Sequence, residues 1–274
     1  MDEAGGAQGV CVGRYGFAAS AGFQPVSRAA MIYRVEASAH AEAPGDLLRL
    51  QAGTAEALRA ADLGAGRQGL WVPAGGTRAG QRVLLGALPA RGHTLLLKAV
   101  ADAGREAPAE QLMRNVMDAY RAGVALGFCI GPGSITSEPS RNERASVTLK
   151  SAAAPGVELV AEIQTVAAPR DGHPLSDVEQ EARALATLGT QLSVLRNAPR
   201  EVAGLAGHEG QVSTDNAREG AVLRYTWFHA GSAARADDPE ILLRASAPAA
   251  RRAQLDAAWA ALLASFRRLP QPSR

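Results

Sequence analysis

The chain has 274 residues, of which 47% are hydrophobic and 20% are charged, and its formal net charge is +2. This length suits one large domain or two average ones, and the composition is that of a folded protein rather than a disordered one. A net charge so close to neutral gives no electrostatic reason to expect binding to nucleic acid. No apolar run reaches the ~18 residues that a membrane-spanning helix needs.

The first half of the chain predicts strands interrupted by one helix and closed by another. Stretches rich in β-branched and aromatic residues predict strands over 9–17, 30–39, 70–74, 81–88 and 93–100. Apolar residues at helical spacing predict helices over 46–63 and 108–124. A Gly-x-Gly-x-x-Gly run at 64–69 is expected to be a loop, because a dinucleotide site needs a strand before it and a helix after it.

The second half repeats this order of elements. Strands are expected over 128–136, 145–152, 156–167, 221–230 and 240–247. Helices are expected over 176–192, with Ser176 and Asp177 as capping candidates, and over 251–269.

One stretch repeats in register without a gap. Leu96 to Ala99 matches Leu242 to Ala245, and the same spacing carries Met113 onto Trp259 and Tyr120 onto Phe266. In both helices the matched apolar residues lie on one face, which must be buried against a sheet. We therefore predict two similar α+β domains, 1–127 and 128–274, that arose by internal duplication, each with a mostly antiparallel sheet and packed helices.

The two cysteines lie in matching frames, Gly9 to Gly13 around Cys11 and Gly127 to Gly131 around Cys129. We interpret each frame as the first strand of a domain, where glycine allows close backbone approach. The cysteines either form one disulfide, if the compartment is oxidising, or remain two buried thiols. The absence of a Cys-x-x-Cys motif removes the common zinc and redox-motif alternatives.

The sequence does not place candidate catalytic or metal-binding residues at the spacings that known hydrolase and zinc motifs require. The nearest serine-hydrolase patterns, at Ser20 and Ser134, are not followed by a predicted helix. The five histidines never pair at metal-ligand spacing, and His208-Glu209 lacks the second histidine of a zinc-protease helix. The sequence therefore predicts no enzyme and no cofactor.

Three polar segments are expected to be long loops suited to protein recognition, namely 139–144, 204–218 and 231–239. The charged residues expected to contact a partner are Arg141, Glu143, His208, Glu209, Asp237 and Asp238.

Three segments carry a resemblance to a known family: "CVGRYGF" at 11–17, "GFCIGPGSIT" at 127–136 and the stretch from Ala203 to Ala247. Together they resemble the immunity proteins paired with type VI secretion lipase effectors. The resemblance implies two α+β domains, no enzymatic activity and a periplasmic location. The start of the chain does not read as a secretory signal, so the leader is expected to have been removed.

The resemblance also implies a function, which is binding of the cognate phospholipase effector and blockage of its active-site entrance. We expect both domains to grip the effector from two sides, with the three polar loops supplying much of the contact. The alternative is a periplasmic module that binds a small molecule in the cleft between its domains. The sequence leaves the oligomeric state open.

Overall fold

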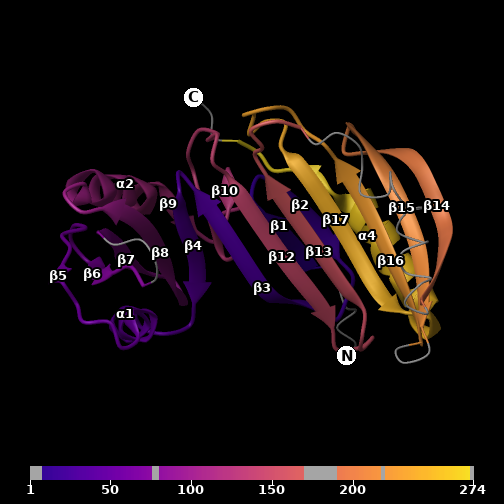
Figure 1. The fold of residues 1–274 in the computed structure, drawn as a ribbon, viewed down its shortest axis with the longest axis horizontal. Coiled ribbons are helices and arrows are strands. Elements are labelled where there is room, and N and C mark those ends of the chain that lie inside the picture. The colour runs from indigo at the N-terminus through magenta and orange to yellow at the C-terminus, as the bar shows by residue number, and fades with distance from the viewer. Residues whose placement is uncertain (1–7, 76–79, 170–189, 217–219, 272–274) are drawn as a thin grey trace, which may run out of the picture. The chain divides into compact units, whose positions relative to one another are not determined.

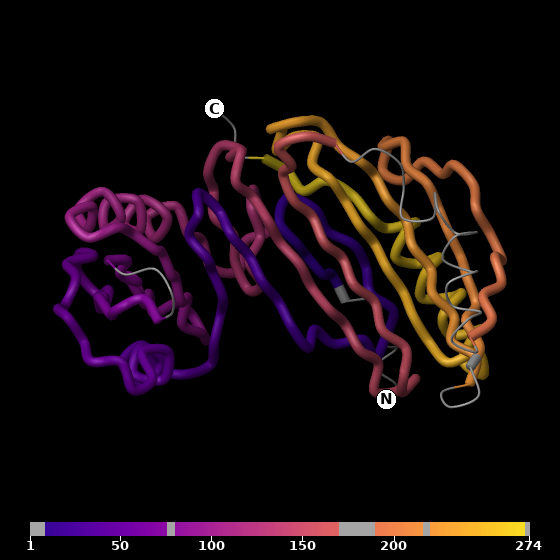
Figure 2. The backbone as a smooth tube through the Cα atoms, in the orientation of Figure 1, coloured from indigo at the N-terminus to yellow at the C-terminus, as the bar shows by residue number. Residues whose placement is uncertain are grey.

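The structure is a computed structural model, and it describes residues 8–75, 80–169, 190–216 and 220–271. The chain forms two compact units. The first unit comprises Met1–Arg28 and Arg144–Leu269, and the second comprises Ala29–Glu143 and Pro270–Arg274. Figure 1 labels the elements of both units, and Figure 2 follows the backbone through them.

The first unit contains six strands that pair antiparallel. They are β12 (Arg144–Ser151), β13 (Glu158–Gln164), β14 (Thr190–Val202), β15 (Leu205–Asn216), β16 (Gly220–His229) and β17 (Glu240–Pro248). Their order is β14-β15-β16-β17-β13-β12. After β17 a short 3-10 turn, η1 (Ala249–Arg251), leads into helix α4 (Arg252–Ser265), which lies on one face of these strands (Figure 1).

Alternation of side chains along β13 explains the two faces of this unit. Leu159, Ala161 and Ile163 are buried, whereas Val160 and Glu162 between them are half-buried on the opposite face. Successive residues of a strand point to opposite sides, so this pattern gives one face to the core and the other to solvent. The solvent-facing side of β12, β13, β17 and β16 is called the open face below.

Helix α4 confirms the prediction over 251–269, although it ends earlier. It buries Leu255, Trp259 and Leu262, and Phe266 follows it in an extended conformation. Phe266 stacks on Tyr15 with ring centroids 5.2 Å apart. The chain then continues as a two-residue strand, β18 (Arg267–Arg268), instead of another helical turn.

The start of the chain completes the core around α4. Strands β1 (Gln8–Val12) and β2 (Tyr15–Ala19) form a hairpin, and β18 pairs with β2. Val10, Val12 and Phe17 are each about 2% exposed. In Figure 2 the indigo start of the chain accordingly lies beside its yellow end.

The second unit has a corresponding set of elements. Its strands are β3 (Phe23–Ile32, which spans the division between the units), β4 (Val35–His40), β5 (Arg59–Ala60), β6 (Gln68–Pro73), β7 (Gln81–Ala90) and β8 (His93–Asp102). They follow the order β3-β4-β8-β7-β6-β5. A separate small sheet has the order β10-β11-β9, from β9 (Tyr120–Ala122), β10 (Phe128–Cys129) and β11 (Gly133–Ile135).

Two helices cover opposite faces of this second set of strands. Helix α1 (Pro44–Ala52) packs Leu47 and Leu48 against a cluster that includes Leu85 and Ala87 of β7. Helix α2 (Glu106–Ala119) lies over Gly86, where an added Cβ would stand 2.3 Å from the sulfur of Met113. Residues 85 and 86 face opposite sides of the strand, and glycine at 86 lets α2 approach closely.

The α+β class and the mostly antiparallel pairing predicted from sequence are confirmed. The Gly-rich run at 64–69 is a turn that leads into β6, so its interpretation as a loop is also confirmed. Both cysteine frames begin a short hairpin, β1–β2 and β10–β11. Only the first frame lies at the start of a compact unit, because residues 127–131 fall inside the unit that contains 29–143.

Several element predictions were wrong. The helix expected over 46–63 ends at Ala52, because Gly53 adopts a positive φ of 59° and the chain turns away. Segment 204–218 was expected to be a loop, but Leu205–Asn216 is strand β15, paired on both sides. Strand β14 before it was not predicted. The helix expected over 176–192 falls largely outside the described residues.

The compact units do not coincide with the predicted segments 1–127 and 128–274. Residues 1–28 belong with 144–269, and residues 29–143 form most of the other unit. The physical reason within the first unit is the pairing of β2 with β18 and the packing of the β1–β2 hairpin near α4. The sequence placed the polar loop 139–144 in the predicted domain 128–274. In the structure, residues 139–143 of this loop belong instead to the unit that contains 29–143.

Of the two alternatives that the sequence left open, we expect one disulfide between Cys11 and Cys129; neither is a free thiol in the structure. A bridge that closes so long a loop stabilises by about 4–5 kcal/mol in the chain-entropy model. Counting reactive thiols in the denatured protein checks this. No reactive thiol before reduction and two after reduction is the expected result, whereas two before reduction would reject the bridge.

Candidate functional site

Two of the predicted partner-binding residues lie in the connection between β11 and β12, and only one is exposed. Arg141 is exposed, whereas Glu143 is about 6% exposed. The Oε1 atom of Glu143 accepts a hydrogen bond of 2.7 Å from the backbone N–H of Ser140. Glu143 therefore shapes this loop, and Arg141 is the side chain of the pair that a partner can reach.

His208 and Glu209 are neighbours on β15 and differ sharply in environment. Glu209 is fully buried, whereas His208 is partly exposed and its Nε2 contacts the side chain of Asn197. Being consecutive residues of one strand, they point to opposite faces. Only His208 is available for a first contact with a partner.

Glu209 is the buried centre of a polar cluster under α4, and the arginines of this cluster are partly exposed. Its Oε2 lies 2.8 Å from Nε of Arg196 and 2.9 Å from Nη1 of Arg200. Its Oε1 accepts hydrogen bonds of 2.7 Å from Nε1 of Trp259 and 3.0 Å from Nε2 of Gln211. Burial raises the pKa of this carboxyl, but the hydrogen bonds from Trp259, Arg200 and Gln211 outweigh it and hold the pKa below its ordinary value.

Asp237 and Asp238 lie in the connection between β16 and β17, which is a loop as predicted. Asp238 accepts hydrogen bonds of 2.8 Å from Nε2 of His229 and 2.5 Å from the hydroxyl of Ser232. Asp237 pairs with Arg235 at 2.7 Å. The Arg235 hydrogen bond lowers the pKa of Asp237. Asp238 also has a lowered pKa, because hydrogen bonds from Ser232 and His229 outweigh the opposing effect of burial.

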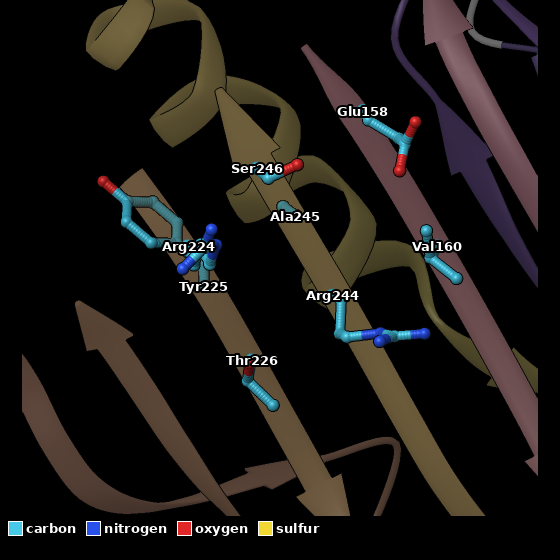
Figure 3. A pocket seen from close by; sticks show the side chains of 8 residues that line it. All are labelled: Glu158, Val160, Arg224, Tyr225, Thr226, Arg244, Ala245 and Ser246. Atoms are coloured by element: carbon cyan, nitrogen blue, oxygen red, sulfur yellow. The ribbon is translucent and has the colours of Figure 1, made fainter. Parts of the chain in front are cut away.

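The open face of the first unit carries two adjoining hollows that were not predicted from sequence. One, of about 240 Å³, is lined by Glu158, Val160, Arg224, Tyr225, Thr226, Arg244, Ala245 and Ser246 (Figure 3). The other, of about 390 Å³, is lined by Arg144, Ala145, Ser146, Glu162, Ile163, Gln164, Glu240 and Leu242. Both are floored by β13 and β17.

Charged and polar side chains of this face are largely paired across strands. Arg244 of β17 forms an ion pair with Glu162 of β13. Lys150 of β12 lies 3.4 Å from Glu158. Such exposed pairs contribute little to stability, but they hold a defined polar surface for recognition.

A signal for this surface was present in the sequence. The strands over 156–167, 221–230 and 240–247 were predicted, and each carries polar residues two positions apart, such as Arg224 and Thr226. The order in which these strands lie side by side was missing, because the pairing of β13 with β17 joins segments far apart in the chain.

Ser134, one of the two serines closest to a hydrolase pattern, is not accessible at the surface. Ser134 is fully buried, and its hydroxyl donates a hydrogen bond of 2.6 Å to the carbonyl oxygen of Val124. Within the described ranges no three His, Cys, Asp or Glu residues come together as a metal site. Among the helices of the described residues, none has the length and hydropathy of a membrane-spanning segment.

Comparison with solved structures finds similar folds over almost the whole chain. The apo immunity protein TplEi of the type VI secretion system of Pseudomonas aeruginosa is 17% identical, with 97% of this chain and 98% of that chain covered and a TM-score of 0.77. A chain of the Tle4–Tli4 complex is 18% identical, with coverage of 99% and 100% and a TM-score of 0.78. TplEi bound to an "L" peptide is 17% identical, with coverage of 98% and 100% and a TM-score of 0.75.

At these identities the structures establish a shared fold, and no curated protein matches the chain. The family model of the Tle cognate immunity protein 4 C-terminal domain matches residues 124–270, which is more than half of the chain. This match includes the open face, the Glu209 cluster and the second cysteine frame. The chain therefore belongs to the Tle cognate immunity protein 4 family.

Proposed function

We propose that the protein is an immunity protein that binds a cognate type VI secretion lipase effector and inhibits it. The family match over residues 124–270 carries this proposal. The similarity in fold to a chain solved in the Tle4–Tli4 complex supports it. The effector's own chemistry then needs no catalytic residue on this chain.

The arrangement of the described side chains favours recognition over catalysis. The buried carboxylates Glu143 and Glu209 are held by hydrogen bonds within the fold. Arg141, His208, Asp237 and Asp238 remain the predicted contact residues, since all four are at least partly exposed. Arg141 belongs to the second unit and the other three to the first, so the proposed grip uses both units.

Inhibition in this proposal is steric. The chain covers the active-site entrance of the effector, and linked contacts from two units gain affinity through a high effective concentration. The encounter takes place in the periplasm, where a lipase delivered by a neighbouring cell meets its substrate membrane. The predicted disulfide fits such an oxidising compartment.

We further propose that the chain arose by internal duplication. The strand order β3-β4-β8-β7-β6-β5 has the same pattern as β12-β13-β17-β16-β15-β14. Helices α2 and α4 have 14 residues each, and each is followed by a short strand that pairs with a cysteine-containing hairpin. These correspondences support the repeat that the sequence predicted.

Co-purification tests the proposed function. The intact chain is expected to form a complex with the lipase effector encoded beside it, and the complex should elute as one species in size-exclusion chromatography. Separate elution of the two folded proteins at micromolar concentration would argue against the proposal.

A further inference from the structure

The smaller hollow on the open face contains four polar side chains at the corners of a square. Antiparallel pairing places Arg224 of β16 opposite Ser246 of β17, and Thr226 opposite Arg244. The two arginines therefore occupy one diagonal, and the two hydroxyl side chains occupy the other. Figure 3 shows these residues rising from the two neighbouring strands. We call them the arginine–hydroxyl quartet.

The spacing of the quartet suits a carboxylate. Diagonal residues on one face of an antiparallel pair lie about 7–8 Å apart, with their Cβ atoms somewhat closer, and long side chains can bridge this separation. Guanidinium groups match carboxylates through paired N–H donors, and hydroxyls add further donors. The hollow of about 240 Å³ is large enough for the carboxylate together with the carbons that carry it.

Charge around the quartet is not balanced. The two neighbouring carboxylates are already engaged, Glu162 by Arg244 and Glu158 by Lys150 at 3.4 Å. Arg224 is exposed and has no ion pair within the described part of the chain. One positive charge is thus left to face solvent beside two hydroxyl groups.

The surroundings favour a protein side chain over a free anion. Arg244 is 48% exposed, so the site is open and would hold a small ion only weakly. Val160 and Leu242 lie on the same face, half-buried, and offer apolar contact next to the charges. A mixed surface of this kind is typical of a protein interface, where arginine is enriched.

We propose that the arginine–hydroxyl quartet is an anchor for an aspartate or glutamate side chain of the effector. This inference rests on the proposed function and identifies one contact within it. Desolvation on docking strengthens the ion pair, and the uncompensated charge of Arg224 steers the encounter.

Charge reversal tests the anchor in the full chain. Arg224→Glu is expected to weaken effector binding at least 30-fold and to slow association, with a loss that shrinks as salt rises, because the interaction is electrostatic. The matched control is Arg252→Glu on α4, whose side chain is 58% exposed and lies on the helix side of the sheet. This control should bind within about threefold of the wild type.

A second variant guards against a folding defect. Ser246→Asp places a carboxylate inside the hollow without removing an arginine, and it should weaken binding in the same direction. Both variants are compared with the wild type by thermal unfolding and surface plasmon resonance. Wild-type affinity in Arg224→Glu and in Ser246→Asp would overturn the anchor while leaving the proposed function intact.

Two further outcomes distinguish a failure of the proposed function from binding of a free anion at the quartet. Wild-type chain that fails to bind the effector would overturn the proposed function, and the anchor with it. A titration with inorganic phosphate serves as the small-anion probe. Tight phosphate binding that Arg224→Glu abolishes, with unchanged effector affinity, would reassign the quartet to a free anion and overturn the proposal.

Discussion

Replacing Glu209 with alanine is expected to lower the free energy of unfolding by about 3 kcal/mol. The change leaves the indole N–H of Trp259 without its acceptor inside the core and leaves Arg196 and Arg200 beside each other without a counter-charge. Urea unfolding at neutral pH measures the loss. The control is Glu201→Ala, because Glu201 is an exposed glutamate on the same hairpin and should change stability by less than about 0.5 kcal/mol.

Lowering the pH should weaken the stabilisation that the Glu209 cluster provides. The pKa of Glu209 is lowered in the folded protein, so its contribution is complete above the unfolded-state pKa near 4.5 and is lost as the pH falls through the lower folded value. Wild-type protein should therefore lose more stability than Glu209→Gln as the pH falls through this range. Equal losses in both proteins, or a stable Glu209→Ala variant, would show that the cluster contributes little.

Removing the β1–β2 hairpin is expected to abolish cooperative unfolding of the first unit. Deletion of residues 1–20 takes away Val10, Val12, Tyr15 and Phe17, each about 2% exposed. Full burial of such a side chain stabilises by about 1.5–3 kcal/mol, so the loss rivals the ~5–15 kcal/mol that holds a whole domain together. Near-ultraviolet circular dichroism of Trp227 and Trp259 should report the collapse of packing.

A rearranged chain provides the matched comparison. Residues 128–274 alone lack the hairpin, whereas residues 144–269 joined by a flexible linker to residues 1–28 contain the complete first unit. We expect the rearranged chain to unfold in a single transition and the simple fragment to show none. A cooperative transition in residues 128–274 would contradict the assignment of the hairpin to this unit.

Local patterns in the sequence were sufficient to predict most of the helices and strands. Helix α4 was recognisable from the spacing of Leu255, Trp259 and Leu262, and β13 from apolar residues at the alternate positions 159, 161 and 163. These signals are local, since a helix or strand on a core must show its own period. The α+β class followed from the order of such elements along the chain.

The predictions that failed depended on how the strands pair, which the local pattern of residues does not show. Strand β15 carries Gly207, His208 and Glu209 where an ordinary strand carries apolar residues, so it looked like a loop. Its buried position at residue 209 is charged because Arg196 and Arg200 of the neighbouring strand compensate it. Neither fact is visible until the strands are paired.

The arginine–hydroxyl quartet was hidden for the same reason. Arg224 and Arg244 are both ordinary exposed arginines in the sequence, and only the register between β16 and β17 places them on one diagonal. Sequence patterns thus identified the family resemblance and the elements, while the candidate surface required the order and register of the sheet.

Titration of the effector's phospholipase activity with the intact chain tests the central claim most directly. We expect activity to fall in proportion to the added chain and to reach the background level near equimolar amounts, with Arg252→Glu equally effective and Arg224→Glu much weaker. Full phospholipase activity in the presence of a large excess of the folded wild-type chain would contradict the claim that this protein is the effector's inhibitor.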